Sequence, residues 1–293
     1  MSVELKWVVD ASSACFHVVD LLLRSRPVND AALAEALTPA TEALASEIDA
    51  SGVSLELFLT HLVPLSANFG SNRQLASVLL TKLAGAQRTE QRIDRLTELF
   101  TQLESAFSRA APDLAEQITR DSEPLRRDWD IHGETLLHSV RRLVEENVVV
   151  PRADVILVPP VQGGGGAAHL LYNSVRIEVL PPDRQPNVPE VVRLAWLIAQ
   201  LNADLPMYQG ELHRDRLAQV AALAMLPAVA TAAVDLGLLE DRAGVIAAVV
   251  AAWGIASSGQ TPLADVLTRW WETWQSQRPE WSIALAALDR LLA

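Results

Sequence analysis

Hydrophobic residues recur every three or four positions along most of this chain, which is the spacing of amphipathic helices. The clearest example is Gln87–Arg109, where the apolar positions share one helix face and the opposite face is charged. A partner-binding coiled coil needs this period for three or four heptads, and here it persists for about two. We therefore expect a packed bundle helix. The other segments with a helical pattern are 3–24, 30–50 with a break at Thr38-Pro39, 71–83, 125–146, 188–201, 211–236, 241–256, 261–277 and 280–292.

The pattern changes between residues 148 and 180, the only part of the chain whose pattern is typical of β-structure. Asp154–Val158 is apolar on both faces, as in a buried strand. Leu171–Leu180 alternates between apolar and polar positions, as in a half-exposed strand. The glycine run Gly163–Gly166 separates these two segments.

These elements predict a mostly helical α+β fold, in which a small sheet of two or three strands near 148–180 is inserted between helical layers. We expect residues 1–147 to form an N-terminal helical region. Residues 148–293 then form the sheet and a C-terminal helical region. The alternative is one continuous domain in which both regions share a core, since 293 residues can build a large one.

The chain is acidic, and its charge restricts the classes of partner. Its formal net charge is −12, and neither half is basic. Nucleic-acid binding relies on clustered cations that displace counterions, so we expect no nucleic-acid partner. Cys15 is the only cysteine, which excludes an intramolecular disulfide and a cysteine-based zinc site. Charges interrupt the N-terminus where a signal peptide is continuously apolar, so we expect a cytoplasmic protein.

Two segments without charged residues, Leu217–Val234 and Ala243–Ala264, suggest a membrane hairpin as an alternative. A spanning helix needs about 20 strongly apolar residues. These segments are rich in alanine and are interrupted by polar residues, by Pro227 and by Gly254. Buried helices of a soluble core fit this composition better, so we expect no membrane partner.

Three local motifs suggest ligand sites, and each has a simpler explanation. Glycine loops bind phosphate where a helix begins directly after them, whereas Gly163–Gly166 precedes a strand, so we expect a flexible or tightly turned connection between strands. His132 and His138 lie about 240° apart around a helix and cannot share a metal ion. The tryptophans between Trp253 and Trp281 form either an aromatic ligand cage or packing anchors, and we expect anchors.

The best candidate site combines polar positions of the predicted strand with those of the helix that follows it. If this helix packs on the sheet, its charges are partly buried and must be paired. One interpretation is a small pocket in which Arg176 or Arg193 binds an anionic group. The other is a structural network that ties helix to sheet through arginine and glutamate. The candidate ligand-binding residues are Tyr172, Arg176, Glu178, Glu190 and Arg193, and Gln200 shares the helix stripe of the last two.

The order of elements over Asp154–Gln200 resembles the core of the zincin metalloproteases: a strand, a glycine-rich turn, an edge-like strand and an apolar helix. In zincins this helix carries the motif HExxH, which supplies two metal ligands and a general base. The corresponding helix here begins at Glu190 with EVVRLAWL and contains no histidine. The resemblance therefore implies a metal-free relative without peptidase chemistry, and no zinc ligand is carried over from it.

The sequence contains no specific nucleophile motif, metal-ligand set or cofactor loop. The leading hypothesis is a non-catalytic intracellular scaffold or interaction module that binds a protein partner or itself, with no cofactor. The alternative is an enzyme or binding protein that takes a small anionic ligand at the junction of strand 171–180 and helix 188–201. A solvent-connected cleft at this junction favours the alternative, and a filled, fully paired interface favours the first.

Overall fold

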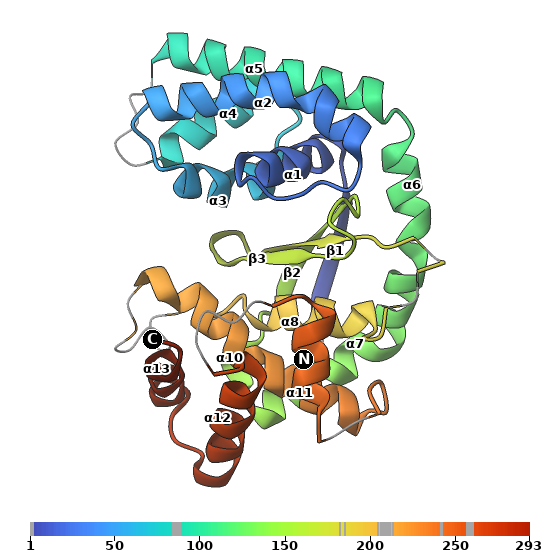
Figure 1. Ribbon diagram of the computed structural model, residues 1–293, viewed down its shortest axis with the longest axis vertical. Helices are drawn as coiled ribbons and strands as arrows, with labels where there is room; N and C mark the ends of the chain where they lie inside the picture. The colour runs from blue at the N-terminus through green and yellow to red at the C-terminus, as the bar shows by residue number, and fades with distance from the viewer. Residues whose placement is uncertain are drawn as a thin grey trace.

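The computed structural model describes residues 3–83, 89–181, 183–184, 186–203, 205, 212, 214–240, 243–255 and 261–293. Figure 1 shows a small sheet at the centre, with one layer of helices above it and another below it. The predicted class, mostly helical with a small sheet, is confirmed. Buried hydrophobic side chains from both layers and from the sheet belong to one cluster, so the two helical regions share a core.

The sheet of the described chain has the strand order β1-β2-β4-β3. Its strands are β1 (Glu4–Val9), β2 (Arg152–Val158), β3 (Gly166–His169) and β4 (Ser174–Glu178). The first, second and fourth strands are parallel, and β3 pairs antiparallel with β4. The carboxyl ends of the parallel strands therefore lie at the same end of the sheet, where β1 leads into a helix and β2 leads into the glycine run.

The N-terminal strand corrects the expectation of one helix over residues 3–24 and of β-structure only near 148–180. β1 pairs with β2 along its whole length. Half-buried Leu5 and Trp7 alternate with exposed residues, which is the period of a strand. The helix begins only after Asp10, whose backbone is extended and whose carboxylate accepts a hydrogen bond of 2.8 Å from the backbone N–H of Ser13.

The upper layer consists of helices from the first part of the chain. They are α1 (Ala11–Leu23), α2 (Ala31–Ala50), α3 (Leu55–Ser66), α4 (Asn72–Lys82) and α5 (Glu90–Ala110). Helix α1 lies between the sheet and the other helices of this layer (Figure 1). The predicted apolar face of α5 is buried in full, at Ile93, Leu96, Leu99, Phe100, Leu103 and Phe107.

The break expected at Thr38-Pro39 does not occur, because α2 continues through Pro39. Proline removes one backbone hydrogen bond from a helix, that of the carbonyl four residues earlier. Pro39 and Glu35 are both exposed, so water can satisfy that carbonyl. The helix is capped instead at Asp30, whose carboxylate accepts a hydrogen bond from the backbone N–H of Leu33 at 2.9 Å.

Two helices connect the layers along one side, α6 (Leu114–Asp121) and α7 (Glu123–Leu143). The lower layer contains α8 (Glu190–Ala199), α10 (Arg214–Asp235), α11 (Val245–Ala252), α12 (Leu263–Gln277) and α13 (Trp281–Leu292). Short 3-10 turns lie at Glu146–Val148 (η1) and Leu170–Tyr172 (η2). Helix α8 contacts β3 and β4 on the face of the sheet opposite to α1. The sheet is therefore covered on both faces.

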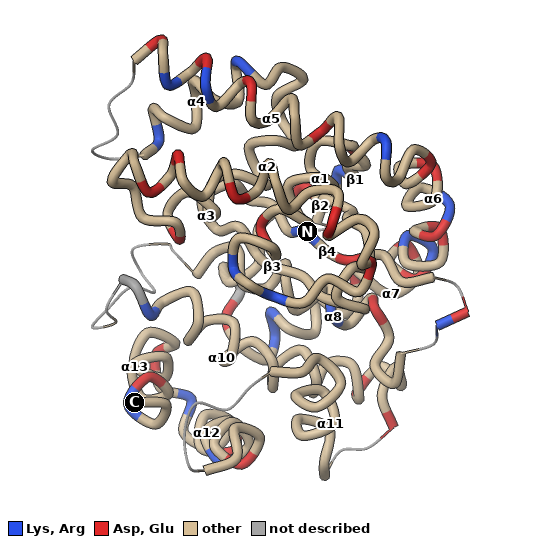
Figure 2. The backbone as a smooth tube through the Cα atoms, turned by 45° about the horizontal axis from the view of Figure 1, so that its top comes forward, with Lys and Arg blue, Asp and Glu red and all other residues tan. Residues whose placement is uncertain are grey.

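One helix of the described chain, over Arg216–Asp235, is long and apolar enough to cross a membrane, and 72% of its most apolar window is buried inside the fold. This is weak support for a membrane span, since buried core helices have the same composition. Figure 2 shows both signs of charge interspersed on the outer N-terminal helices, whereas α11 carries no charge and α10 carries charges only at its two ends. The second apolar segment, Ala243–Ala264, contains the short helix α11, and its residues 256–260 lie outside the described part.

Candidate functional site

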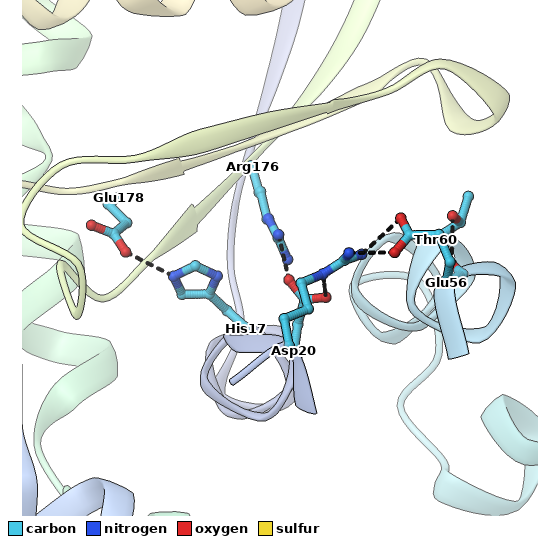
Figure 3. Close-up of polar contacts among 7 residues, drawn as sticks. His17, Asp20, Glu56, Thr60, Arg176 and Glu178 are labelled. Carbon is cyan, nitrogen blue, oxygen red and sulfur yellow. Dashed lines mark hydrogen bonds and ion pairs between the residues drawn. The ribbon is translucent and has the colours of Figure 1, made fainter. Parts of the chain in front are cut away.

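The polar face of β4 is buried, which corrects the expectation of a half-exposed strand. All five residues of Ser174–Glu178 are buried. Val175 and Ile177 alternate with the polar residues, as predicted, but α1 covers the polar side. Arg176 and Glu178 point toward α1 in Figure 3, where His17 and Asp20 meet them. The polar alternation therefore marks an interface between sheet and helix, not a solvent face.

Arg176 forms an ion pair with Asp20 of α1, and both side chains are buried. The second carboxylate oxygen of Asp20 accepts a hydrogen bond of 2.8 Å from Arg24, which in turn contacts Glu56 of α3. Burial raises the pKa of Asp20, but the two guanidinium groups outweigh this effect and hold its pKa below the ordinary value. These four residues form a chain of alternating charges from the sheet to the surface of α3.

Glu178 accepts hydrogen bonds from three groups. The backbone N–H of Gln162 donates at 3.0 Å, that of Gly164 at 2.7 Å, and His17 Nε2 lies 3.0 Å from Oε1. A carboxylate can only accept, so Nε2 of His17 carries the proton. Burial lowers the pKa of His17 by more than Glu178 raises it, which favours the neutral imidazole. The carboxylate of Glu178 is thus held by backbone amides and one neutral histidine.

This arrangement explains the glycine run. Gly163 and Gly164 have φ values of +83° and +114°, which non-glycine residues rarely adopt. A Cβ atom on Gly164 would also lie 2.9 Å from Nη1 of Arg193. The amide of Gly164, a donor that a phosphate-binding loop would offer to its ligand, donates instead to Glu178. The run is a tight turn, as expected, that binds a carboxylate of the protein itself.

The two candidate residues on α8, Glu190 and Arg193, have polar atoms without hydrogen-bond partners in the described chain. Arg193 is buried in α8, and its Nη2 lies 3.4 Å from Oε1 of Glu190. Within the described chain, Nε and Nη1 of Arg193 and both carboxylate oxygens of Glu190 make no hydrogen bond. The indole N–H of Trp253 is also unpaired there. The guanidinium lies 5.7 Å from the centre of the Trp253 ring, so these unpaired groups are neighbours.

Exposure increases outward from Arg193. Its side chain is 6% exposed and that of Glu190 is 14% exposed, while Trp253 is half-buried and Arg184 is exposed. Arg184 lies against Gly163, next to the contact between Gly164 and Arg193. Burial raises the pKa of Glu190, although Arg193 opposes the shift. We call Glu190, Arg193, Trp253 and Arg184 the α8 site; its residues range from exposed Arg184 to buried Arg193.

The remaining candidate, Tyr172, lies elsewhere. It belongs to η2 and not to the strand, and its hydroxyl hydrogen-bonds Nδ1 of His61 on α3. The five candidate residues therefore occupy three environments: Tyr172 beside α3, Arg176 and Glu178 under α1, and Glu190 with Arg193 on α8. Gln200 is buried and donates to the carbonyl of Trp196 within its own helix at 3.0 Å.

His17 and Asp20 are not among the candidate residues, and Trp253 is one of the tryptophans expected to be packing anchors. In the sequence, His17 and Asp20 only interrupt the apolar pattern of a helix. Their spacing of three placed them on one face, but the partners lie more than 150 residues away. Beside them, half-buried His169 has its pKa lowered to about 3 by desolvation and by Arg176, and its Nε2 and the hydroxyl of Ser174 lack hydrogen-bond partners in the described chain.

The other motifs found in the sequence are accounted for by packing. Trp270, Trp271, Trp274 and Trp281 are buried in α12 and α13. The first two indole N–H groups donate to Ala284 and Thr231, at 2.9 and 3.0 Å. The described residues contain no group of three metal-ligating side chains that could hold an ion. Burial raises the pKa of the Cys15 thiol, and this cysteine is free.

No model of a protein family, no curated protein and no solved structure matches the chain.

Proposed function

We propose that this protein is a non-catalytic binding protein that takes a small ligand with an anionic group at the α8 site. One observation carries the proposal: buried Arg193 and its neighbour Glu190 have polar atoms without hydrogen bonds in the described chain. Buried polar groups are nearly always hydrogen-bonded, because an unmet group costs about 1–3 kcal/mol. A ligand that supplies these partners removes that cost on binding. The Trp253 indole adds a further donor.

The contacts that Glu178 and Arg176 already make argue against a ligand on these two side chains. Nδ1 of His17, Nε2 of His169 and the hydroxyl of Ser174 lack hydrogen-bond partners beside them in the described chain. Glu178 has three donors and Arg176 has Asp20, so a ligand there would displace existing contacts. These residues act as support, because Glu178 holds the turn against which Arg193 packs. In this proposal the residues of the α8 site bind the ligand. The buried strand β4 positions the glycine turn against which Arg193 packs.

The proposal includes a relation to the zincins in which no metal takes part. The order β2, glycine turn, edge strand β3, β4 and helix α8 supports this relation. Glu190 and Arg193 have the spacing of the glutamate and the second histidine of HExxH. An arginine at that position is a fixed cation and cannot ligate a metal ion. We propose that the Arg193 guanidinium supplies the positive charge of this helix, in a protein of the cytoplasm.

A thermal-shift screen of the purified protein tests the proposal, with metal ions, nucleotides and small anionic metabolites as probes. A compound that binds only the folded state raises the melting temperature by mass action. We expect a small anion to raise it, and the shift to vanish in Arg193→Ala. Arg95→Ala is the matched control, because Arg95 forms an exposed ion pair with Glu98 in α5. Absence of any shift, or an equal shift in Arg193→Ala, would refute the proposal.

The second candidate function is self-association through α13. Ile283 and Leu291 are 57% and 58% exposed and lie eight residues apart in α13, about 12 Å along the helix and about 80° around its axis. Their exposure at the C-terminal helix favours an apolar contact with a second copy. Sedimentation of the wild type and of Ile283→Glu at several concentrations tests it. A concentration-dependent dimer that the substitution removes supports this function, and a monomer at every concentration excludes it.

A further inference from the structure

We infer that the ligand of the α8 site is a compact zwitterion of the α-amino acid type, with its carboxylate on Arg193 and its ammonium group on Glu190. This inference rests on the function proposed above and adds the chemical class of the ligand. It depends on two properties of the site: the sum of its charges and the distance between them.

The charges of the site and of the adjoining Glu178 sum to zero. Arg193 and Arg184 contribute two positive charges, Glu190 contributes one negative charge, and Glu178 beside the site contributes the second. A nucleotide or other polyanion needs an excess of cations, as phosphate sites do. A neutral site with separated charges instead favours a ligand that is neutral as a whole and dipolar. An inorganic anion would meet the arginines and also both carboxylates.

The unpaired atoms have both polarities. Arg193 offers donors at Nε and Nη1, and Trp253 offers a third donor, whereas Glu190 offers two oxygens that only accept when ionised. A carboxylate can take the donors but leaves Glu190 unmet. An ammonium group has the opposite defect. Only a ligand with both groups provides partners for Arg193 and for Glu190. This matters because buried polar atoms without hydrogen bonds are costly.

The distance between the two sides sets the size of the ligand. Nη2 of Arg193 and Oε1 of Glu190 are 3.4 Å apart, so the two charged groups of the ligand must be close neighbours. In an α-amino acid one carbon atom separates them. A peptide has its ammonium and carboxylate at opposite ends and cannot satisfy both residues. The site also adjoins Trp253, itself stacked on Trp196 with ring centres 4.8 Å apart, which offers aromatic surface to a side chain.

Glu190 also suits an ammonium partner electrostatically. Burial raises the pKa of its carboxyl group, and the neighbouring Glu178 raises it further. A cation placed on Glu190 counteracts both effects and favours the ionised form. Arg193 is already close, but its distance and geometry leave both carboxylate oxygens without a hydrogen bond in the described chain.

Calorimetric titration of the full chain separates the inference from the function on which it rests. The probes are the twenty L-amino acids, sodium propionate as a carboxylate without an amine, and ethylamine as an amine without a carboxylate. We expect at least one amino acid to bind at least ten-fold more tightly than propionate and ethylamine, which corresponds to about 1.4 kcal/mol. Glu190→Gln keeps the size of the side chain and should remove this preference. It should also bind propionate more tightly than the wild type does, because the carboxylate next to Arg193 is lost.

Each outcome decides one of the two claims. If propionate binds as tightly as every amino acid, or if Glu190→Gln leaves the preference intact, the zwitterion is refuted and the anion-binding function stands. If no probe binds, and no compound of the thermal-shift screen does, both claims fail. Arg193→Met should abolish binding of amino acids and propionate alike. Retention of a far-ultraviolet spectrum and a cooperative melting transition in each variant shows that the loss comes from the site.

Discussion

Replacement of Glu178 tests whether its buried carboxylate holds the glycine turn and α1 together. The side chain is 1% exposed and accepts from two backbone amides and from His17. Glu178→Ala leaves all three donors without a partner. Each buried unmet group costs about 1–3 kcal/mol, and loss of one member of a buried charged network costs about 3–5 kcal/mol. These contacts share one carboxylate, so we expect about 3–5 kcal/mol in total, not their sum.

The assay is urea unfolding at pH 7, with the free energy of unfolding taken from the midpoint and slope. A loss of this size is a large part of the about 5–15 kcal/mol of a typical domain, so Glu178→Gln is measured as well. It retains one acceptor oxygen and should lose about 1–3 kcal/mol. The control is Glu98→Ala, which removes an exposed ion pair and should change stability by less than about 1 kcal/mol. An alanine variant at Glu178 that matches this control would show that the carboxylate does not hold the turn.

Three further predictions concern the glycine turn, the half-buried His169 and the tryptophan cluster. Gly164→Ala should destabilise more than Gly52→Ala, since both have positive φ but only the former places a Cβ against Arg193; an equal loss in urea unfolding would contradict this. Below pH 6.5 the unfolded state protonates His169 and the folded state, with a pKa of about 3, does not, so stability should fall by about 1.4 kcal/mol per pH unit as pH decreases, and less in His169→Asn. Trp281→Ala empties a fully buried site and should cost about 3–5 kcal/mol, seen as a lower melting temperature.

The elements that could be predicted are those whose pattern is local. Helix α5 has an apolar face with a period of three to four residues, and that face is buried. The sequence predicts a helix over 188–201, and α8 spans Glu190–Ala199 with Pro189 as its N-cap. In both cases the residues that decide the structure lie within one or two helical turns of each other.

The predictions are wrong where the structure of a segment depends on residues far away in the sequence. Glu4–Val9 could not be separated from α1 by periodicity, because its strand state depends on pairing with β2 almost 150 residues later. The same holds for β4, whose alternation is that of a half-exposed strand until α1 covers its polar side. Propensity and pattern record what a segment prefers, and the partner that covers it is decided by the whole fold.

The local sequence pattern predicts where the candidate residues are buried. It does not predict which of them already have hydrogen-bond partners within the protein. Charged residues on an apolar helix and an alternating strand indicated buried charges, and Arg176, Glu178 and Arg193 are indeed buried. Which of them are saturated depends on His17 and Asp20, which no spacing connects to them. Tyr172 was assigned to the strand, although a left-handed residue, Asn173, separates it from β4.

The hydrogen bonds around Glu178 explain how Arg193 keeps its position, although two of its nitrogens make no hydrogen bond in the described chain. A buried cation with unpaired nitrogens is costly, and nothing in α8 alone would fix its position. Arg193 packs against Gly164, which has no side chain and whose amide is fixed by Glu178, and His17 anchors Glu178 to α1. A hydrogen-bonded network on one face of the sheet therefore positions an incompletely paired arginine near the other face. Such preorganisation is what a binding site needs, because the cost of ordering it is met during folding and not during binding.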